Sequence, residues 1–196
     1  MDKSDLIAAD GKIHMYTVQT KAVADCIERL GYSVVKKEYI EKKYGESSWV
    51  FDEAYGFFRC ASESMGFFPS EGAESPIWLF ASKKWLYGEP GSFLIEAAFP
   101  PERLLIFDRE KWQKVLSLSY IGRDEEDEKR FSKSLERAGI QSGFEVFSTP
   151  FYPLFKAEIK RSRERIFDTE NTSPENIQAA VWELKKDDIV SLKSIR

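Results

Sequence analysis

"KIHMYTVQTKAVADCIERLG", residues 12–31, carries the clearest fold signal in the chain. Its first half alternates β-branched or aromatic residues with polar ones, which is typical of a strand with one covered face. Its second half places Val23 and Ile27 at helical spacing and stops at Gly31, the residue that best tolerates a left-handed helix end. Thr20 stands between the two halves and can cap the helix. The stretch therefore predicts a strand that leads directly into a helix.

The same two patterns continue along the rest of the chain. Further strands are expected within residues 76–82, 92–99, 100–108, 176–184 and 187–196. Further helices are expected within residues 49–66, 108–121, 122–139 and 147–168, and residues 32–45 are expected to begin as a short strand and continue into a helical turn. Strands at both ends, helices early and late, and no regular strand–helix–strand alternation predict an α+β fold with a central, mostly antiparallel sheet and flanking helices. A length of 196 residues suits one compact domain over residues 1–196.

Composition excludes several classes of protein. With 42% apolar residues and 14% aromatic ones, the chain has enough large side chains to build a core, so global disorder is excluded. A net charge of -4 gives no overall attraction to nucleic acid or acidic lipid. No window approaches the roughly 18 apolar residues of a membrane span, and no leader pattern opens the chain. We therefore expect a cytoplasmic protein without a membrane partner.

The sequence offers few residues for a metal site or for a catalytic triad. Cys26 and Cys60 form no CxxC pair and His14 is the only histidine, so a zinc site is not expected. Any Ser-His-Asp or Cys-His arrangement would need His14, and neither cysteine has a local activating signature. The helix expected over residues 122–139 carries charges of both signs, which we interpret as a solvated face.

Two glutamines interrupt segments that otherwise favour burial. A period of two places Gln19 on the strand face of Ile13, and Gln178 of "NIQAAVWEL" on the face of Ala180. A buried amide without partners costs about 1–3 kcal/mol, so each glutamine should find a partner or line a cavity. One alternative is an amide bonded to neighbouring backbone or placed at a strand edge. The other is a pocket shared by both amides, which requires the two distant segments to be neighbouring strands.

Aromatic residues and carboxylates supply further candidates for such a pocket. A planar ring could stack in a group of aromatic side chains: Tyr55, Phe57, Trp78, Trp85 and Trp182. Trp78, which follows Pro76, is the strongest of them, although residues at these spacings also suit a core. Glu96 and Glu183 lie in strand-like surroundings, where a carboxylate beside apolar groups awaits a cationic partner and is a site candidate. The alternative for both is a strand position that faces solvent.

A basic helix offers a different function. The segment "FKAEIKRSRER" holds five cations, which would suit phosphate backbones: Lys156, Lys160, Arg161, Arg163 and Arg165. The acidic overall charge counts against a nucleic-acid partner but does not remove it.

Several motifs together resemble a family of small bacterial proteins catalogued as a domain of unknown function. They cover almost the whole chain: "YTVQT", "YIEKKYGE", "EAYGFF", "PIWLF", "KWQKVLSLSYI", "TPFYPLFKAEIKRSRERIFD" and "IQAAVWELKKDDIV". The chain departs from the family pattern at Arg163, where a tryptophan is usual. The resemblance implies a compact single domain of bacterial or phage origin and supplies no reaction.

The order of the segments is also faintly similar to the ADP-ribosyltransferase fold. That similarity implies that Thr17 and Gln19 bind NAD, that Trp78 stacks on nicotinamide, and that Glu183, oriented by Gln178, is the catalytic carboxylate. A fixed carboxylate beside developing positive charge stabilises a transition state more than a ground state. The late-strand spacing is not the usual one for that family, and a regular strand would send Gln178 and Glu183 to opposite faces.

Three functional hypotheses follow. The first is a pocket for a small molecule or nucleotide, formed by Thr17, Gln19, Tyr55, Trp78 and Gln178. The second is an NAD-dependent transferase with Glu183 as its catalytic residue. The third is a non-enzymatic module that interacts with a protein or a nucleic acid.

Overall fold

A six-stranded antiparallel sheet dominates the computed structural model, which describes residues 1–195 apart from the side chains at 40, 41 and 43. In spatial order its strands are β5 (Leu105–Asp108), β6 (Ile177–Val181), β3 (Ile77–Phe80), β1 (Ile13–Gln19), β4 (Phe93–Phe99) and β8 (Ile189–Ser194). Two short strands, β2 (Tyr32–Ser33) and β7 (Leu184–Lys185), pair separately. The α+β fold with an antiparallel sheet is therefore confirmed.

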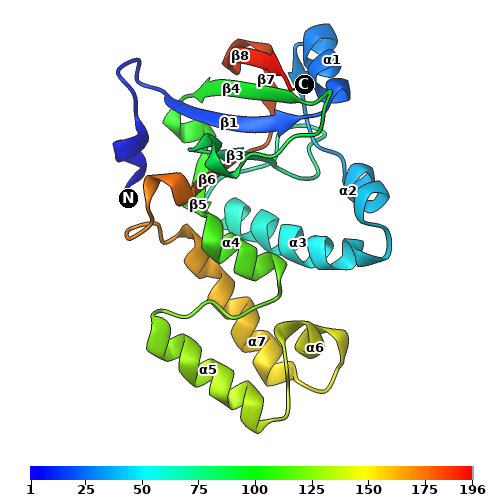
Figure 1. Ribbon diagram of the computed structural model, residues 1–196, viewed down its shortest axis with the longest axis vertical. Coiled ribbons are helices and arrows are strands. Elements are labelled where there is room, and N and C mark those ends of the chain that lie inside the picture. The colour runs from blue at the N-terminus through cyan, green and yellow to red at the C-terminus, as the bar shows by residue number, and fades with distance from the viewer. Residues whose placement is uncertain (196) are drawn as a thin grey trace.

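Helices surround the sheet and extend below it. They are α1 (Lys21–Leu30), α2 (Lys37–Tyr44), α3 (Ser48–Ser64), α4 (Arg109–Leu116), α5 (Glu125–Arg137), α6 (Gly143–Ser148) and α7 (Pro153–Ser162). Figure 1 shows the strands in the upper half of the molecule, α3 and α4 beneath them, and α5, α6 and α7 grouped at the lower end. We call this lower group, residues 125–162, the helical lobe. It has a small core of its own, made of Phe131, Ile140, Val146 and Ile159.

Two local signals in the sequence act where they were expected, whereas Thr20, at the N-cap of α1, makes no side-chain capping hydrogen bond. Gly31 ends α1 with φ 83° and donates its N–H to the Ile27 carbonyl. Asp108 caps α4, because its carboxylate accepts hydrogen bonds from the Glu110 and Lys111 backbone N–H groups. These two residues explain why the end of α1 and the start of α4 fall close to their predicted places.

The two faces of the sheet are covered by different helices. On one face, Met15, Leu79 and Ala179 pack with Ile27 of α1, so we call it the α1 face. On the other, Phe107 and Ala180 pack with residues of α3 and α4, so we call it the α3 face. Because α3 and α4 contact mainly the β5–β6–β3 half, most side chains of β1 and β4 on the α3 face stay partly exposed.

The expectation that the segments of Gln19 and Gln178 are neighbouring strands is wrong. Strand β3 lies between β1 and β6 and pairs with both. The two glutamines also point to opposite faces. Gln178 is in register with Phe80 and Tyr16, so these three side chains share a face. Gln19 is three residues from Tyr16 on β1, and an odd spacing along a strand places a side chain on the other face. A hollow shared by both amides is therefore not formed.

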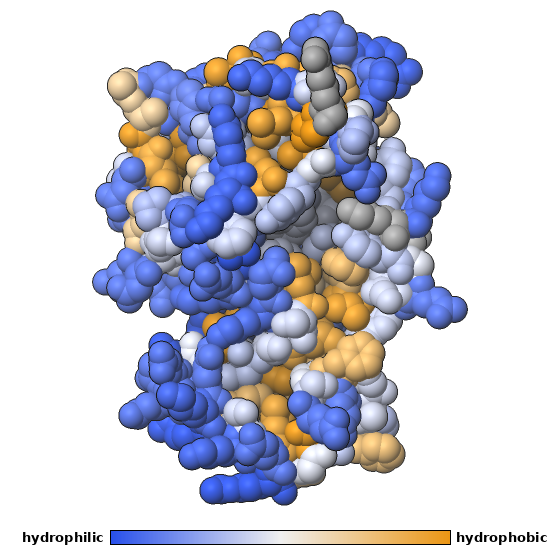
Figure 2. Space-filling model, viewed as in Figure 1, coloured by the Kyte–Doolittle hydropathy of each residue, from blue (hydrophilic) through white to orange (hydrophobic). Residues whose placement is uncertain are grey.

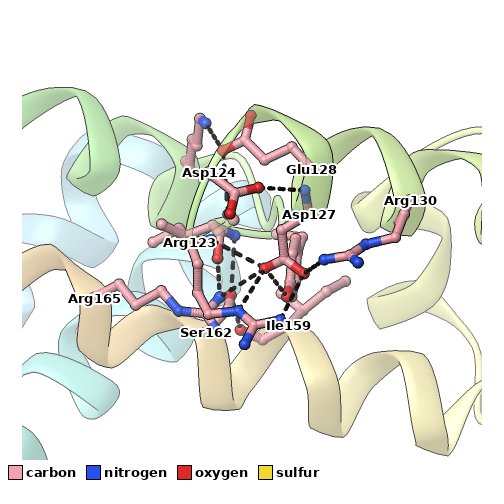
Figure 3. Close-up of polar contacts among 12 residues, drawn as sticks. Arg123, Asp124, Asp127, Glu128, Arg130, Ile159, Ser162 and Arg165 are labelled. Carbon is pink, nitrogen blue, oxygen red and sulfur yellow. Dashed lines mark hydrogen bonds and ion pairs between the residues drawn. The ribbon is translucent and has the colours of Figure 1, made fainter.

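One carboxylate of α5 departs from the interpretation of that helix as a solvated face, although most of its charged side chains are exposed. Asp127 is only 8% exposed and lies at the centre of the polar contacts in Figure 3. It accepts a 2.9 Å hydrogen bond from the Tyr120 hydroxyl, a 3.0 Å bond from the Arg123 backbone N–H and a 3.1 Å bond from Arg130 Nη2. The hydrogen bonds from Arg123 hold the pKa of this carboxyl well below its usual range. Asp127 therefore joins α5 to the segment that connects it with α4.

Candidate functional site

One row of side chains crosses the α3 face of the sheet. Register places Phe107, Gln178, Phe80, Tyr16, Glu96 and Ser191 opposite one another on β5, β6, β3, β1, β4 and β8. Directly opposed residues of antiparallel strands share a face, and neighbouring strands are about 4.7–4.9 Å apart. We call the four central members, Gln178, Phe80, Tyr16 and Glu96, the central row.

Gln178 is the most unusual member of the central row. Its side chain is 3% exposed, and its Oε1 atom is buried without a hydrogen-bond partner in the described part of the chain. An unpaired buried carbonyl oxygen costs about 1–3 kcal/mol, so the fold retains it at some expense. The alternative of an amide that is hydrogen-bonded to neighbouring backbone therefore does not hold for the Oε1 atom of Gln178.

Aromatic rings flank Gln178 on the same face. Phe80, directly opposite it on β3, is partly exposed. Trp78 lies one row away, opposite Ala180, with its ring centroid 5.3 Å from that of Tyr55 on α3. Burial raises the pKa of the Tyr55 hydroxyl to about 12. The structure therefore brings Tyr55, Trp78 and Gln178 to one face, where Trp78 also packs on the rings of Phe58 and Trp112.

Charged groups lie at the β1–β4 end of the central row. Lys83 Nζ is 4.5 Å from the Tyr16 ring centroid. His14 Nδ1 is 3.6 Å from Glu96 Oε1, and His14 Nε2 is 3.0 Å from an Asp10 carboxylate oxygen. Burial raises the pKa of the Tyr16 hydroxyl, and the Glu96 charge adds to the rise. This end therefore offers a cation, a phenol and a carboxylate within reach of one ligand.

Figure 2 shows where this face meets solvent. The surface is hollowed between the strands in the upper part of the view and α3 beneath them. Tyr16, Trp78 and Phe80 are partly exposed although they belong to central strands of the sheet. A central strand that is covered on both faces would bury such large side chains, so the α3 face is open at this point.

Thr17 and Gln19 do not belong to this face. Thr17 is 3% exposed and pairs with Ile95, a residue of the core under α1. Gln19 Nε2 donates a 2.9 Å hydrogen bond to Thr17 Oγ1. The predicted binding set is therefore divided between two faces: Thr17 and Gln19 on one, and Tyr55, Trp78 and Gln178 on the other.

Glu183 lies beyond the end of β6, in a separate hollow. That hollow has a volume of about 340 Å³ and is lined by Gly66, Phe67, Phe68, Ser70, Glu102, Arg103, Val181, Trp182 and Glu183. The Glu183 carboxylate is 3.4 Å from Lys185 Nζ. Its backbone carbonyl accepts a 3.2 Å hydrogen bond from Arg103, which also binds Asp188. Glu183 and the pair of Thr17 and Gln19 are thus at different places on the molecule.

The cations of the predicted basic helix are mostly engaged inside the protein. Arg163 is 1% exposed and bonds Glu53, which Lys160 also contacts. Lys156 Nζ lies 3.4 Å from two backbone carbonyl oxygens, and Arg165 bonds the Ile121 carbonyl. Only Arg161 among the five is exposed without such a contact in the described residues. The helix is therefore not a continuous cationic stripe.

No group of three or more His, Cys, Asp or Glu side chains is arranged to hold a metal ion among the side chains described. No helix in residues 1–195 is long and apolar enough to cross a membrane.

Comparison with protein families identifies a family model that covers most of the chain. A family model described as a domain of unknown function, DUF3841, matches residues 14–190. The chain belongs to the DUF3841 family. No curated protein and no solved structure matches it. The DUF3841 region contains the whole central row, from Tyr16 to Gln178, so this face is part of the family domain.

Residue patterns pointed to only part of this site. They singled out Gln178, Trp78, Tyr55 and Glu96 but not Tyr16, Phe80 or Lys83. The alternation along residues 12–20 does assign Tyr16 and His14 to the same face of β1. What the pattern lacks is the register that places Tyr16 opposite Phe80 and Glu96.

Proposed function

We propose that the α3 face, at the central row, binds a small molecule with a planar ring, of the nucleotide class. The partly exposed rings of Tyr16 and Phe80 supply flat apolar surface on neighbouring strands. Such surface suits stacking of a base or a nicotinamide ring, worth about 0.5–1.5 kcal/mol beyond area burial. Ligand sites of this kind combine apolar walls with a few placed polar groups.

The observation that carries the proposal is the unpartnered Oε1 atom of Gln178. A carbonyl oxygen in the row with two aromatic rings is an acceptor for an N–H or O–H group of the ligand. The bound ligand would relieve the cost of leaving this atom unpaired. Lys83, which makes no ion pair in the described part of the chain, supports a negatively charged group such as a phosphate at the Tyr16 end.

An NAD-dependent transferase is the second candidate. Its earlier form, with NAD on Thr17 and Gln19 and with Glu183 as catalytic carboxylate, needs groups that lie on different parts of the molecule. The observation that favours a revised form is the position of Glu96 in the central row, beside His14. A held carboxylate of this kind can stabilise positive charge that develops on a ribose. In this candidate Glu96 replaces Glu183.

Ligand binding can be tested with a matched pair of glutamine variants. Calorimetric titration with ATP, ADP-ribose and NAD should give saturable binding of at least one of them to the wild type. Gln178→Ala should weaken that binding about tenfold, since it removes a hydrogen bond from a desolvated site. Gln19→Ala changes the same kind of side chain on the α1 face and should bind as the wild type does. Equal affinity in all three proteins would contradict the proposal.

Turnover separates the two candidates. Incubation with NAD, followed by chromatography for free nicotinamide, detects a transferase or hydrolase. Loss of nicotinamide release in Glu96→Gln, with release retained in Glu183→Gln, would support the revised transferase. Binding without release supports a non-catalytic site. Nicotinamide release that is lost in Glu183→Gln instead would place the catalytic carboxylate in the hollow that Glu183 lines, and would refute the assignment to Glu96.

A further inference from the structure

A cation-rich seam joins α3 to α6 and α7. Lys156, Lys160 and Arg163 follow one another at spacings of four and three residues, so they lie on one side of the helix. Arg163 Nη1 donates a 2.9 Å hydrogen bond to Glu53 Oε1 on α3, and Lys160 Nζ is 2.8 Å from the same oxygen. One carboxylate oxygen thus serves two cations.

The aromatic ring of Phe147 lies close to all three cations of this seam. The Phe147 ring centroid lies 5.4 Å from Lys156 Nζ, 5.8 Å from Lys160 Nζ and 5.0 Å from Arg163 Cζ. Three positive charges are therefore held around one aromatic side chain of α6. Glu53 is the only carboxylate that forms an ion pair with any of them in the described part of the chain.

Donor groups in the seam also lack acceptors. Arg163 is 1% exposed, yet its Nε and Nη2 atoms make no hydrogen bond in the described residues. The Thr149 hydroxyl oxygen, on the chain just after α6, is likewise buried without a partner. The hydrogen bonds of Lys156 to the Phe147 and Thr149 carbonyls are both long, at 3.4 Å. The seam thus holds two guanidinium nitrogens and a hydroxyl oxygen that have no hydrogen-bond partner in the described residues, beside two ammonium groups.

We propose that this seam is a binding site for an oxyanion of the phosphate class. A phosphate oxygen is the acceptor that the free edge of a guanidinium group fits best, and a nearby hydroxyl and two ammonium groups complete such a site. Glu53 occupies one edge of the Arg163 fork in the free protein. Burial lowers the pKa of Arg163 while Glu53 raises it, so a second anion would further stabilise the charged form. The site does not depend on the proposed function of the central row.

Thermal unfolding with matched salts tests the proposal. Sodium phosphate or pyrophosphate, at ten times the dissociation constant of that anion, should raise the Tm of the wild type by about 3–6 °C, whereas sodium chloride of equal ionic strength should not. The double substitution Lys156→Gln and Lys160→Gln should abolish the rise. Arg161→Gln removes an exposed cation from the same helix outside the seam and should keep it. A rise that persists in the double variant, or that chloride reproduces, overturns the proposal.

Glu53→Gln distinguishes an anion site from a merely structural one. Without anion this variant should unfold at a lower temperature, because Arg163 loses its charged partner. With phosphate its rise in Tm should exceed that of the wild type, and its affinity for phosphate should be at least about threefold tighter, since an internal competitor is gone. An unchanged or smaller phosphate effect in Glu53→Gln contradicts the site.

A fluorescent single-stranded oligonucleotide identifies the source of the phosphate. Binding of both phosphate and the oligonucleotide, weakened alike by the double substitution, assigns the seam to a nucleic-acid backbone. Binding of phosphate or pyrophosphate alone assigns it to a small molecule. Binding of neither removes the proposal.

Discussion

At the scale of single residues, the protein holds polar groups in places where the fold alone does not satisfy them. The Oε1 atom of Gln178 and two nitrogens of Arg163 are buried without partners in the described residues. Each costs stability, because a desolvated donor or acceptor loses its bonds to water. Such groups mark positions where a ligand would add stability.

Removal of Glu53 should destabilise the protein through Arg163. Glu53→Ala leaves a guanidinium group that is 1% exposed without its charged partner. Fully buried pairs cost about 3–5 kcal/mol to break, and since the Glu53 side chain is 28% exposed we expect about 2 kcal/mol. Urea denaturation measures the change. Glu63→Ala, which breaks the exposed pair of the same helix with Arg59, should cost under about 1 kcal/mol. An equal loss of unfolding free energy in the two variants would contradict the predicted role of Glu53.

At the scale of elements, the position of α6 depends on a close backbone approach. A Cβ atom on Gly143, the first residue of α6, would lie 1.9 Å from the Leu118 carbonyl oxygen. Backbone cannot move aside as a side chain can. The helical lobe is therefore fixed to the end of α4 partly because this residue has no side chain.

Two glycine substitutions should have opposite effects. Gly143→Ala should destabilise the protein by about 2–3 kcal/mol, because it forces the two segments apart. Gly56→Ala, within α3, meets nothing within 4 Å and should stabilise by up to about 1 kcal/mol through helix propensity. Urea denaturation of the wild type and of each variant measures the change in the free energy of unfolding. A neutral Gly143→Ala would show that α6 is not held by this contact.

Asp127 should make the attachment of α5 sensitive to acid. Its folded pKa lies below the ordinary value of about 3.9, chiefly because of hydrogen bonds from Arg123. The stability that it contributes is therefore complete above that ordinary value and is lost as pH falls through the lowered folded pKa. The difference in Tm between the wild type and Asp127→Asn should be constant near neutral pH and shrink below about pH 4. A difference that is independent of pH down to pH 2 would contradict this role.

At the scale of the whole molecule, the sheet and the helical lobe have separate cores. Phe131 is 7% exposed and packs with Ile140, Val146 and Ile159, whereas Leu79 belongs to the core between the sheet and α1. Small cores with fewer buried side chains open more readily than large ones. We expect amides of α5 and α6 to exchange with solvent before those of β1 and β3.

Hydrogen exchange with mass spectrometry can show this difference directly. Phe131→Ala should speed exchange in α5, α6 and α7 while leaving β1 and β3 nearly unchanged. Leu79→Ala should speed exchange throughout, because it weakens the sheet on which the other elements rest. If Phe131→Ala accelerates exchange in the sheet to the same extent, the two cores unfold as one unit.

The sequence by itself determined the elements and their class. Alternation defined the strand that became β1, Gly31 ended α1, and Asp108 capped α4. These signals depend on residues within one turn or one strand, where spacing and backbone preference are decided locally. Gln178 and Glu96 stood out as polar residue types in apolar segments, and Trp78 and Tyr55 as aromatic rings that could stack on a planar group.

Only the tertiary structure decided which of those residues share a face. Strand β3 separates β1 from β6, so Gln178 meets Phe80 and Tyr16 rather than Gln19. Pairing between segments far apart in the chain depends on the packing of the whole core, and a shift of register by one residue would reverse every side chain. Local patterns do not encode strand pairing, so the sequence predicted Gln19 rather than Phe80 and Tyr16 as the neighbour of Gln178.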